Sequence, residues 1–329
     1  ILLIITSTDL EYRMTEQFFE ALVQGDKRTI ARAITYIESE YPESETLLKQ
    51  IHVKTGNAYR IGITGPPGSG KSTLTNQLTK LYRKQGLKIG IIAVDPTSPF
   101  TGGALLGDRV RMSEIGRDEG VFIRSMATRG SLGGLNKKAV DAADVLDAAG
   151  YDLILYETVG VGQSELDIVK AADTTIVVLV PESGDAVQAM KAGIMEIADF
   201  FVVNKSDRPG AEQAVTALKS MLQFRDHDET TWMPGIVQTI ASENEGLEDV
   251  AGEITRHREH QEKFQTFLSR REKKSRERIK DIVETKIIRE LWKKDNEEKL
   301  VDAVREVVVG KVSPYDIAES IIEAFKNRF

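Results

Sequence analysis

Short apolar runs alternate with amphipathic segments along the chain from Tyr59 onward. Uninterrupted apolar runs are typical of parallel strands that are buried on both faces, with helices between successive strands. The pattern therefore predicts an α/β fold, with a mainly parallel central sheet flanked by helices. The runs that we expect to be strands cover residues 61–64, 89–94, 153–156, 176–180 and 201–203.

Helical segments are predicted on both sides of this central part. Between residues 15 and 54, apolar side chains such as Phe18, Leu22 and Ile30 recur at three- to four-residue spacings, as in amphipathic helices. Residues 256–294 are densely charged, with apolar positions at the same spacing, which predicts a long helix or a helix pair. We expect an N-terminal helical segment (1–55), a central domain (56–255) and a C-terminal helical extension (256–329).

A complete phosphate-binding motif follows the first predicted strand. Its residues match G-x-x-x-x-G-K-[ST], and a helix-like segment begins at Thr73 directly after them. The glycines let backbone N–H groups converge on phosphates, Lys71 can reach the β and γ oxygens, and Ser72 can bind Mg²⁺. A strand before the motif and a helix after it are the context that nucleotide binding requires. We name this segment the phosphate loop: Gly65-Pro66-Pro67-Gly68-Ser69-Gly70-Lys71-Ser72.

A second motif, Asn204-Lys205-Ser206-Asp207, follows the run 201–203 and is named the guanine loop. Ligands of parallel sheets lie at the carboxyl ends of the strands, where this loop is expected. Asp207 can accept hydrogen bonds from N1–H and the 2-amino group of guanine, which adenine cannot supply. By analogy with N-K-x-D GTPases, Asn204 contacts the base and the loop, and the stem of Lys205 packs on the ring. On its own the tetrapeptide could be an ordinary surface turn, but its position favours guanine recognition. The predicted nucleotide site also includes Thr73, Ala241 and Ser242.

Three acidic residues are candidates for the magnesium site. Glu157, after the run 153–156, stands where GTPases usually have the Asp of D-x-x-G, and Gly160 N–H could meet the γ-phosphate. An ordinary strand-end carboxylate is the alternative for Glu157. Asp95 follows another run and is expected near Mg²⁺, whereas Asp108 lies in a loop that is either a nucleotide-sensing switch or simply solvated. We predict metal binding by Ser72, Asp95, Asp108 and Glu157, and catalysis by Lys71, Asp108 and Glu157.

The net charge and the cysteine and histidine content of the chain disfavour several classes of binding partner. The formal net charge is −7, so no overall basic field favours binding of nucleic acid or of an anionic membrane. The absence of cysteine rules out disulfides and, with only four histidines, disfavours a zinc- or nickel-carrying role. No stretch of about 18 uninterrupted apolar residues predicts a membrane span, and we expect a cytoplasmic protein.

Taken together, these motifs resemble the MeaB/ArgK-type GTPases, the chaperones of adenosylcobalamin-dependent methylmalonyl-CoA mutase. The matching segments occur in order between about residues 15 and 250, and Glu in place of Asp at position 157 is typical of that family. The charged C-terminal helices resemble the family's dimerisation arm in character only. Besides the phosphate loop, the resemblance rests on residues 93–98, on residues 101–103 through 107–109, on Leu132-Gly133-Gly134 and on residues 157–165.

The resemblance implies a GTPase that uses GTP, GDP and Mg²⁺, docks on the mutase and gates loading and protection of its cofactor by nucleotide state. It implies a homodimer, and it places a third, mutase-responsive switch at Asp185, Gln188 and Lys191. Without the family, that segment would be a helix start with exposed polar residues. It also supports the phosphate, metal and guanine roles given above.

Three alternatives share the nucleotide site. A metal-delivery GTPase would be expected to carry a Cys or His cluster, which the composition disfavours. An ArgK-like transport-associated ATPase or kinase would need an acceptor site and a preference for adenine, against which Asp207 argues. A scaffold that binds nucleotide without turnover is distinguished by measured hydrolysis. Spacing cannot identify an arginine finger among Arg109, Arg111 and Arg129.

Overall fold

The computed structural model describes residues 16–96, 115–128, 134–158, 171–181, 194–224 and 228–326. The chain divides into two compact units, Ile1–Arg270 and Arg271–Phe329. Each unit is described by itself. The sheet and the two sequence motifs belong to the first unit.

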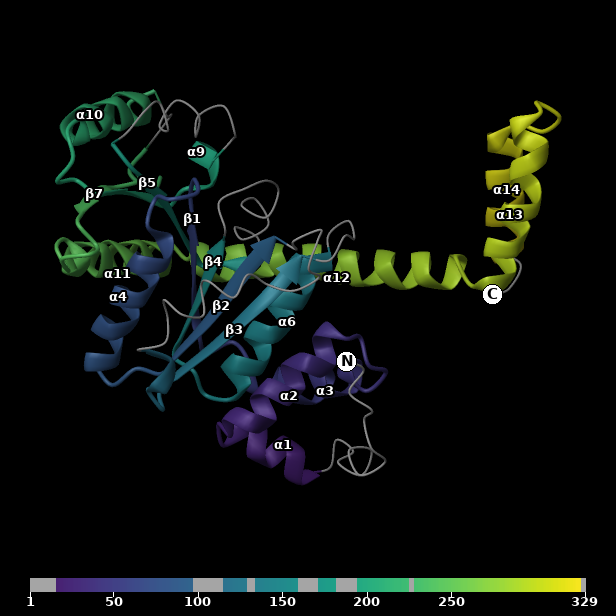
Figure 1. The fold of residues 1–329 in the computed structure, drawn as a ribbon, viewed down its shortest axis with the longest axis horizontal. Helices are drawn as coiled ribbons and strands as arrows, with labels where there is room; N and C mark the ends of the chain where they lie inside the picture. Colours follow the sequence, from purple (N-terminus) through teal and green to yellow (C-terminus); the bar gives the residue numbers. More distant parts are fainter. Residues whose placement is uncertain are drawn as a thin grey trace. The chain divides into compact units, whose positions relative to one another are not determined.

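Within the described ranges, seven strands form one sheet in the order β3-β2-β4-β1-β5-β6-β7, and each pairing is parallel (Figure 1). The predicted fold class is therefore confirmed. Four predicted runs fall within strands, and the fifth, 176–180, extends one residue beyond the end of β5. Strands β3 and β7 were not predicted, because β3 mixes polar and apolar residues and β7 is short. The strands are β1 (Tyr59–Thr64), β2 (Ile89–Pro96), β3 (Val121–Thr128), β4 (Leu153–Thr158), β5 (Thr174–Leu179), β6 (Phe200–Asn204) and β7 (Ile236–Thr239).

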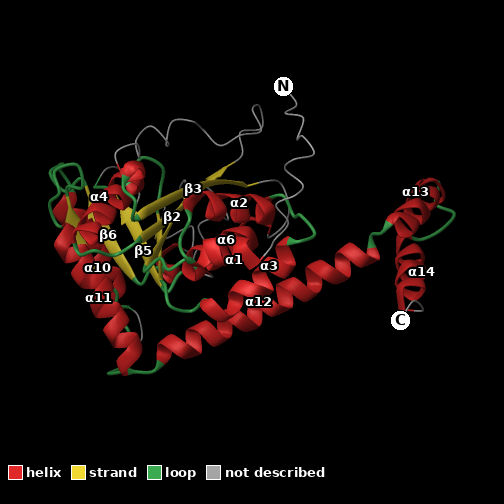
Figure 2. Ribbon diagram, turned by 90° about the horizontal axis from the view of Figure 1, so that it is seen from below, coloured by secondary structure: helices red, strands yellow, loops and turns green. Residues whose placement is uncertain are grey.

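Helices cover both faces of the sheet (Figure 2). In β4, Ile154 and Tyr156 join one apolar cluster, while Leu153 and Leu155 join another, because alternate side chains of a strand point to opposite faces. The first cluster contains α6, and the second contains α4 and α11. This two-sided burial explains the uninterrupted apolar runs. The helices of the sheet region are α4 (Lys71–Lys84), α6 (Gly134–Ala148), α9 (Ile194–Ile197), α10 (Ala211–Leu222) and α11 (Leu247–Lys263), with 3-10 turns η2 (His52–Lys54) and η3 (Ile115–Arg117).

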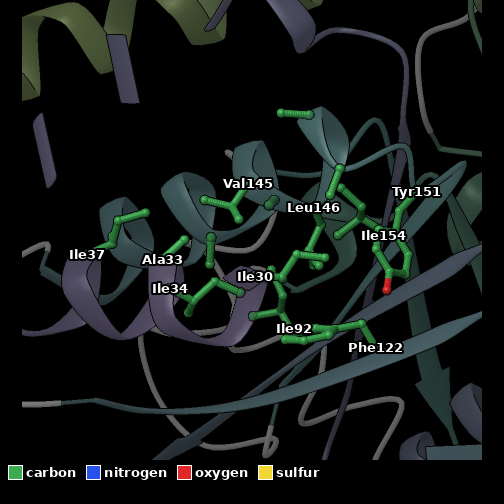
Figure 3. Close-up of a cluster of buried hydrophobic side chains, with 14 of the residues drawn as sticks. Ile30, Ala33, Ile34, Ile37, Ile92, Phe122, Val145, Leu146, Tyr151 and Ile154 are labelled. Carbon is green, nitrogen blue, oxygen red and sulfur yellow. The ribbon is translucent and has the colours of Figure 1, made fainter. Parts of the chain in front are cut away.

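The predicted N-terminal helices are part of the same core. They are α1 (Glu16–Val23), α2 (Lys27–Glu38) and α3 (Ser44–Ile51). Asp26 caps α2, because its Oδ1 accepts a hydrogen bond from Thr29 N at 2.8 Å. Ile30 and Ile34 of α2 are fully buried with Leu146 of α6, as Figure 3 shows. The N-terminal helices thus complete the layer that covers one face of the sheet.

The C-terminal unit is helical, as predicted. It contains most of α12 (Thr266–Leu291) together with α13 (Lys294–Val308) and α14 (Pro314–Lys326). Ser313 caps α14, since its Oγ accepts from Tyr315 N at 3.1 Å. No described residue of α12 is buried, and Ile279, Val283 and Ile287 are exposed. No helix in the described ranges is long and apolar enough to cross a membrane.

We predict that Ile34→Ala destabilises the first unit by about 2–5 kcal/mol, because the truncation leaves a cavity between α2 and α6. Urea unfolding measures the change. The matched control is Val53→Ala, since Val53 is 80% exposed, and its effect should stay within about 0.5 kcal/mol. Equal effects of the two substitutions would show that α2 is not part of the core.

Candidate nucleotide site

The phosphate loop connects β1 to α4, and two of its glycines lie where a side chain has no room. Gly65 has φ 137°, and a Cβ added there would lie 2.1 Å from the carbonyl oxygen of Val178 in β5. Gly70 has φ 92°, and an added Cβ would lie 2.2 Å from Nδ2 of Asn204. Both glycines are therefore required by close contacts as well as by backbone conformation. The loop is pressed against β5 on one side and the guanine loop on the other.

Lys71, the first residue of α4, is only 6% exposed. Its Nζ donates to the carbonyl oxygens of Gly65 at 2.8 Å and Pro66 at 2.9 Å. A buried ammonium group is costly unless it is hydrogen-bonded, and these carbonyl groups provide that compensation. The positive charge is thus held inside the turn of the phosphate loop, where the motif predicts it.

Ser72 and Glu157 form the described part of the predicted magnesium site. Ser72 Oγ donates to Oε1 of Glu157, which is 6% exposed. Glu157 pairs in register with Ile63 of β1, near the start of the phosphate loop. A hydroxyl and a carboxylate are hard oxygen ligands, and Mg²⁺ typically binds one or two carboxylates, substrate phosphates and water. The two side chains therefore fit this ion.

The structure describes only the backbone of Asp95 and nothing of Asp108, the other two predicted metal ligands. Asp95 belongs to β2, two residues after Ala93, the register partner of Glu157. Its backbone therefore lies at the same edge of the sheet as Glu157, but its side chain and the whole of Asp108 lie outside the described parts. Among described residues, no group of three or more His, Cys, Asp or Glu side chains could hold a metal ion.

Asn204 connects three segments of the site. Its Nδ2 donates to the carbonyl oxygen of Ser69 at 2.8 Å, in the phosphate loop. Its Oδ1 accepts from Thr239 Oγ1 at 3.0 Å and from Ala241 N at 3.1 Å. The side chain is 3% exposed, so each of these bonds is shielded from water. Hydrogen bonds consequently connect the guanine loop to the phosphate loop and to the end of β7 with the residues that follow it.

The rest of the guanine loop is also held by specific contacts. Lys205 has φ 58°, and its Nζ donates to the carbonyl oxygen of Gly68 at 2.7 Å. Ser206 donates to the carbonyl oxygen of Thr239 from N at 3.1 Å and from Oγ at 2.8 Å. Asp207 is exposed and therefore accessible to a base. The arrangement leaves Asp207, the predicted specificity residue, exposed on a loop whose other residues are held by hydrogen bonds.

The structure brings together the predicted residues 65–73, Glu157, 204–207 and 241–242 at the carboxyl ends of β1, β4, β6 and β7. Asp185, Gln188, Lys191, Asp108 and Gly160 lie outside the described residues. Thr239 was missed. Its signal was its position at the end of a strand beside β6, but a four-residue strand with the sequence IVQT has too weak a pattern to be recognised.

A strand, a complete phosphate loop and a helix, with an N-K-x-D loop bonded to the phosphate loop, define a GTPase of the P-loop class. The family model described as methylmalonyl-CoA mutase-associated GTPase MeaB matches residues 30–296. The chain belongs to this family of GTPases, as its motifs predicted.

Similar proteins agree with this assignment. The GTPase ArgK of Escherichia coli is 40% identical over 238 residues, which cover 70% of this chain and 71% of ArgK. The mouse methylmalonic aciduria type A homolog, a mitochondrial protein, is 31% identical over 343 residues, with 98% of this chain and 82% of that protein covered. The crystal structure of a LAO/AO transport system kinase is 28% identical, has a TM-score of 0.71, and covers 94% of this chain and 97% of its own.

We predict that Asn204→Ala weakens GDP binding by about tenfold or more, because the loss of a buried hydrogen-bonded group typically costs about 1–3 kcal/mol. Calorimetric titration with GDP measures the change. Thr239→Val is the matched control, since it removes one of the three bonds and leaves the contact with Ser69. GDP affinity unchanged in Asn204→Ala would show that the link between the loops does not support binding.

Proposed function

We propose that this GTPase is a chaperone that docks on adenosylcobalamin-dependent methylmalonyl-CoA mutase and controls cofactor loading and protection through its nucleotide state. The observation that carries the proposal is the match of residues 30–296 to a family described as mutase-associated. The likeness to the methylmalonic aciduria type A homolog over 98% of this chain supports it. The bonded phosphate and guanine loops supply a site through which nucleotide state can act.

Hydrolysis in this proposal depends on charge placed where phosphate charge develops. Lys71 offers its ammonium to the β and γ oxygens, and Ser72 and Glu157, with Asp95 and Asp108, would hold Mg²⁺. When bound, the metal ion neutralises part of the phosphate charge. Backbone N–H groups of the phosphate loop and the start of α4 orient the phosphates. Because no complete transition-state clamp can be assigned, basal turnover is expected at about 10⁻² s⁻¹ or less.

The C-terminal helices are proposed to form a homodimer arm. Exposed Ile279, Val283 and Ile287 follow one another at four-residue spacing, so they share one face of α12. An apolar face of this kind is suited to pairing with another helix. We keep the predicted domain boundaries at residues 55 and 255 as part of this proposal, with the dimerisation arm from residue 256 onward.

A transport-associated kinase is a second candidate, favoured by the name of the solved LAO/AO transport system kinase. It would transfer phosphate from ATP to an acceptor. The open carboxylate of Asp207 favours guanine instead, so nucleotide preference separates the two candidates.

We expect Asp207→Asn to change the base preference from guanine to xanthine. The carboxylate accepts from the guanine 2-amino group, whereas an amide can donate to the 2-oxo group of xanthine. A site built around such a bond can reject the wrong partner by about 10⁴ or more. Competition of XTP against GTP measures the ratio. Glu212→Gln, an acidic residue nearby on α10, is the control, and a ratio that stays the same in Asp207→Asn would remove Asp207 from base recognition.

The chaperone role predicts that the GTP-analogue and GDP complexes bind the mutase with different affinities, by a factor of about 5 to 150. The reason is that a ligand shifts an equilibrium only through differential binding. Replacement of both Gln188 and Lys191 by alanine should bring the factor towards one while nucleotide binding stays nearly intact. Calorimetry of mutase binding in each nucleotide state tests this. Equal coupling in native and variant protein would place the switch elsewhere, and no mutase binding at all would remove the chaperone role but not the GTPase.

A further inference from the structure

An ionic cluster around the buried Asp199 lies at the amino-terminal ends of the strands, whereas the nucleotide site lies at their carboxyl ends. This residue directly precedes β6, and its side chain is 9% exposed. Oδ2 accepts from Thr175 N at 2.8 Å, and Oδ1 lies 2.9 Å from Nη2 of Arg270 and 3.3 Å from Nε2 of His257. Both carboxylate oxygens are therefore engaged, one by the sheet and one by helices α11 and α12.

The surroundings favour the charged form of this carboxylate. Burial raises its pKa, but the hydrogen bond from His257 and the charges of His257 and Arg270 outweigh burial and hold the pKa of Asp199 below its ordinary value. His257 is 1% exposed and lies 2.8 Å through Nδ1 from Thr174 Oγ1. Trp232 packs beside it, with ring centroids 4.7 Å apart. The cluster is built from β5, the residue before β6, the loop that carries Trp232, α11 and the start of α12.

Arg270 lies where α12 leaves the first compact unit, since this unit ends at Arg270. Near it, Phe267 stacks on Tyr59 of β1 with ring centroids 6.1 Å apart. Arg270 itself is 47% exposed, so it can be replaced without opening the core. The stacking of Phe267 on Tyr59 and the ion pair between Arg270 and Asp199 thus hold the start of α12 against the sheet.

One strand joins this cluster to the guanine loop. Asp199 directly precedes β6, Asn204 is the last residue of β6, and all five residues of this strand are buried. β6 pairs with β5 on one side and β7 on the other. Packed interiors transmit strain rather than absorb it. A change in the contacts of Asp199 can therefore alter the position of Asn204 at the other end of β6.

We propose that Arg270 is a positioning residue that couples the attachment of the first turns of α12 to guanine-nucleotide binding. The coupling runs through Asp199 and β6. The inference rests on the proposed guanine site. It identifies the start of α12, up to Arg270, as a segment whose attachment to the sheet responds to bound nucleotide.

Hydrogen exchange of the amide groups of residues 270–274, with and without GDP, tests the coupling. Their helical hydrogen bonds reach back to residues 266–270, so exchange reports detachment of the first turns. We expect GDP to slow exchange by about fivefold or more in the native protein, within the usual range of coupling factors. In Arg270→Ala, exchange should be fast and independent of GDP, and Arg270→Lys should restore part of the dependence. Lys273→Ala, an exposed cation of the same helix, should behave as native.

A merely structural role has a different signature. If Arg270→Ala speeds exchange but GDP still slows it by the native factor, the coupling is refuted. It is equally refuted if GDP leaves exchange unchanged in the native protein while calorimetry shows that GDP binds. Failure of the native protein to bind GDP in the same titration would instead overturn the proposed guanine site, and with it this inference.

Discussion

The three hydrogen bonds of the Asn204 side chain are the constraint on which the rest of the site depends. They join the phosphate loop, the guanine loop and the segment after β7, which are far apart in the sequence. Because Asn204 is buried, loss of the contact with Ser69 would leave the amide Nδ2 unsatisfied at a cost of about 1–3 kcal/mol. The predicted phosphate and guanine loops are therefore parts of one hydrogen-bonded structure. This arrangement also explains why glycine is needed at position 70, next to the amide nitrogen.

The sheet is what brings these loops together. Parallel strands place their carboxyl ends at one edge, so β1, β4, β6 and β7 deliver Gly65, Glu157, Asn204 and Thr239 to neighbouring positions. Burial on both faces fixes the register of each strand, because a shift by one residue would exchange the two apolar clusters. The N-terminal helices contribute to this rigidity, since they cover one of these faces. At the amino-terminal ends of the strands, the contact between Asp199 and Arg270 attaches the first turn of α12 to the same framework.

Much of the fold and the central part of the site could be predicted from the sequence, and the reasons are physical. The run at 153–156 predicted β4 because burial on both faces requires apolar residues at every position, and the phosphate loop was identified because its chemistry fixes residue types at fixed spacing. β3 and β7 were missed, since edge strands are only partly covered and tolerate polar residues such as Arg124 and Gln238. Thr239 was missed together with β7, because it is the last residue of that strand. The contact of Arg270 with Asp199 joins distant segments, and no local pattern records it.

Guanine specificity on a complete phosphate loop is the central claim, and calorimetric titration of the native protein with GDP and with ADP, both with Mg²⁺, tests it most directly. Adenine lacks the two donors that Asp207 is proposed to bind, so GDP is expected to bind about 10⁴-fold more tightly than ADP. Equal affinity for the two nucleotides would contradict the account, because the guanine loop would then have no part in selecting the base.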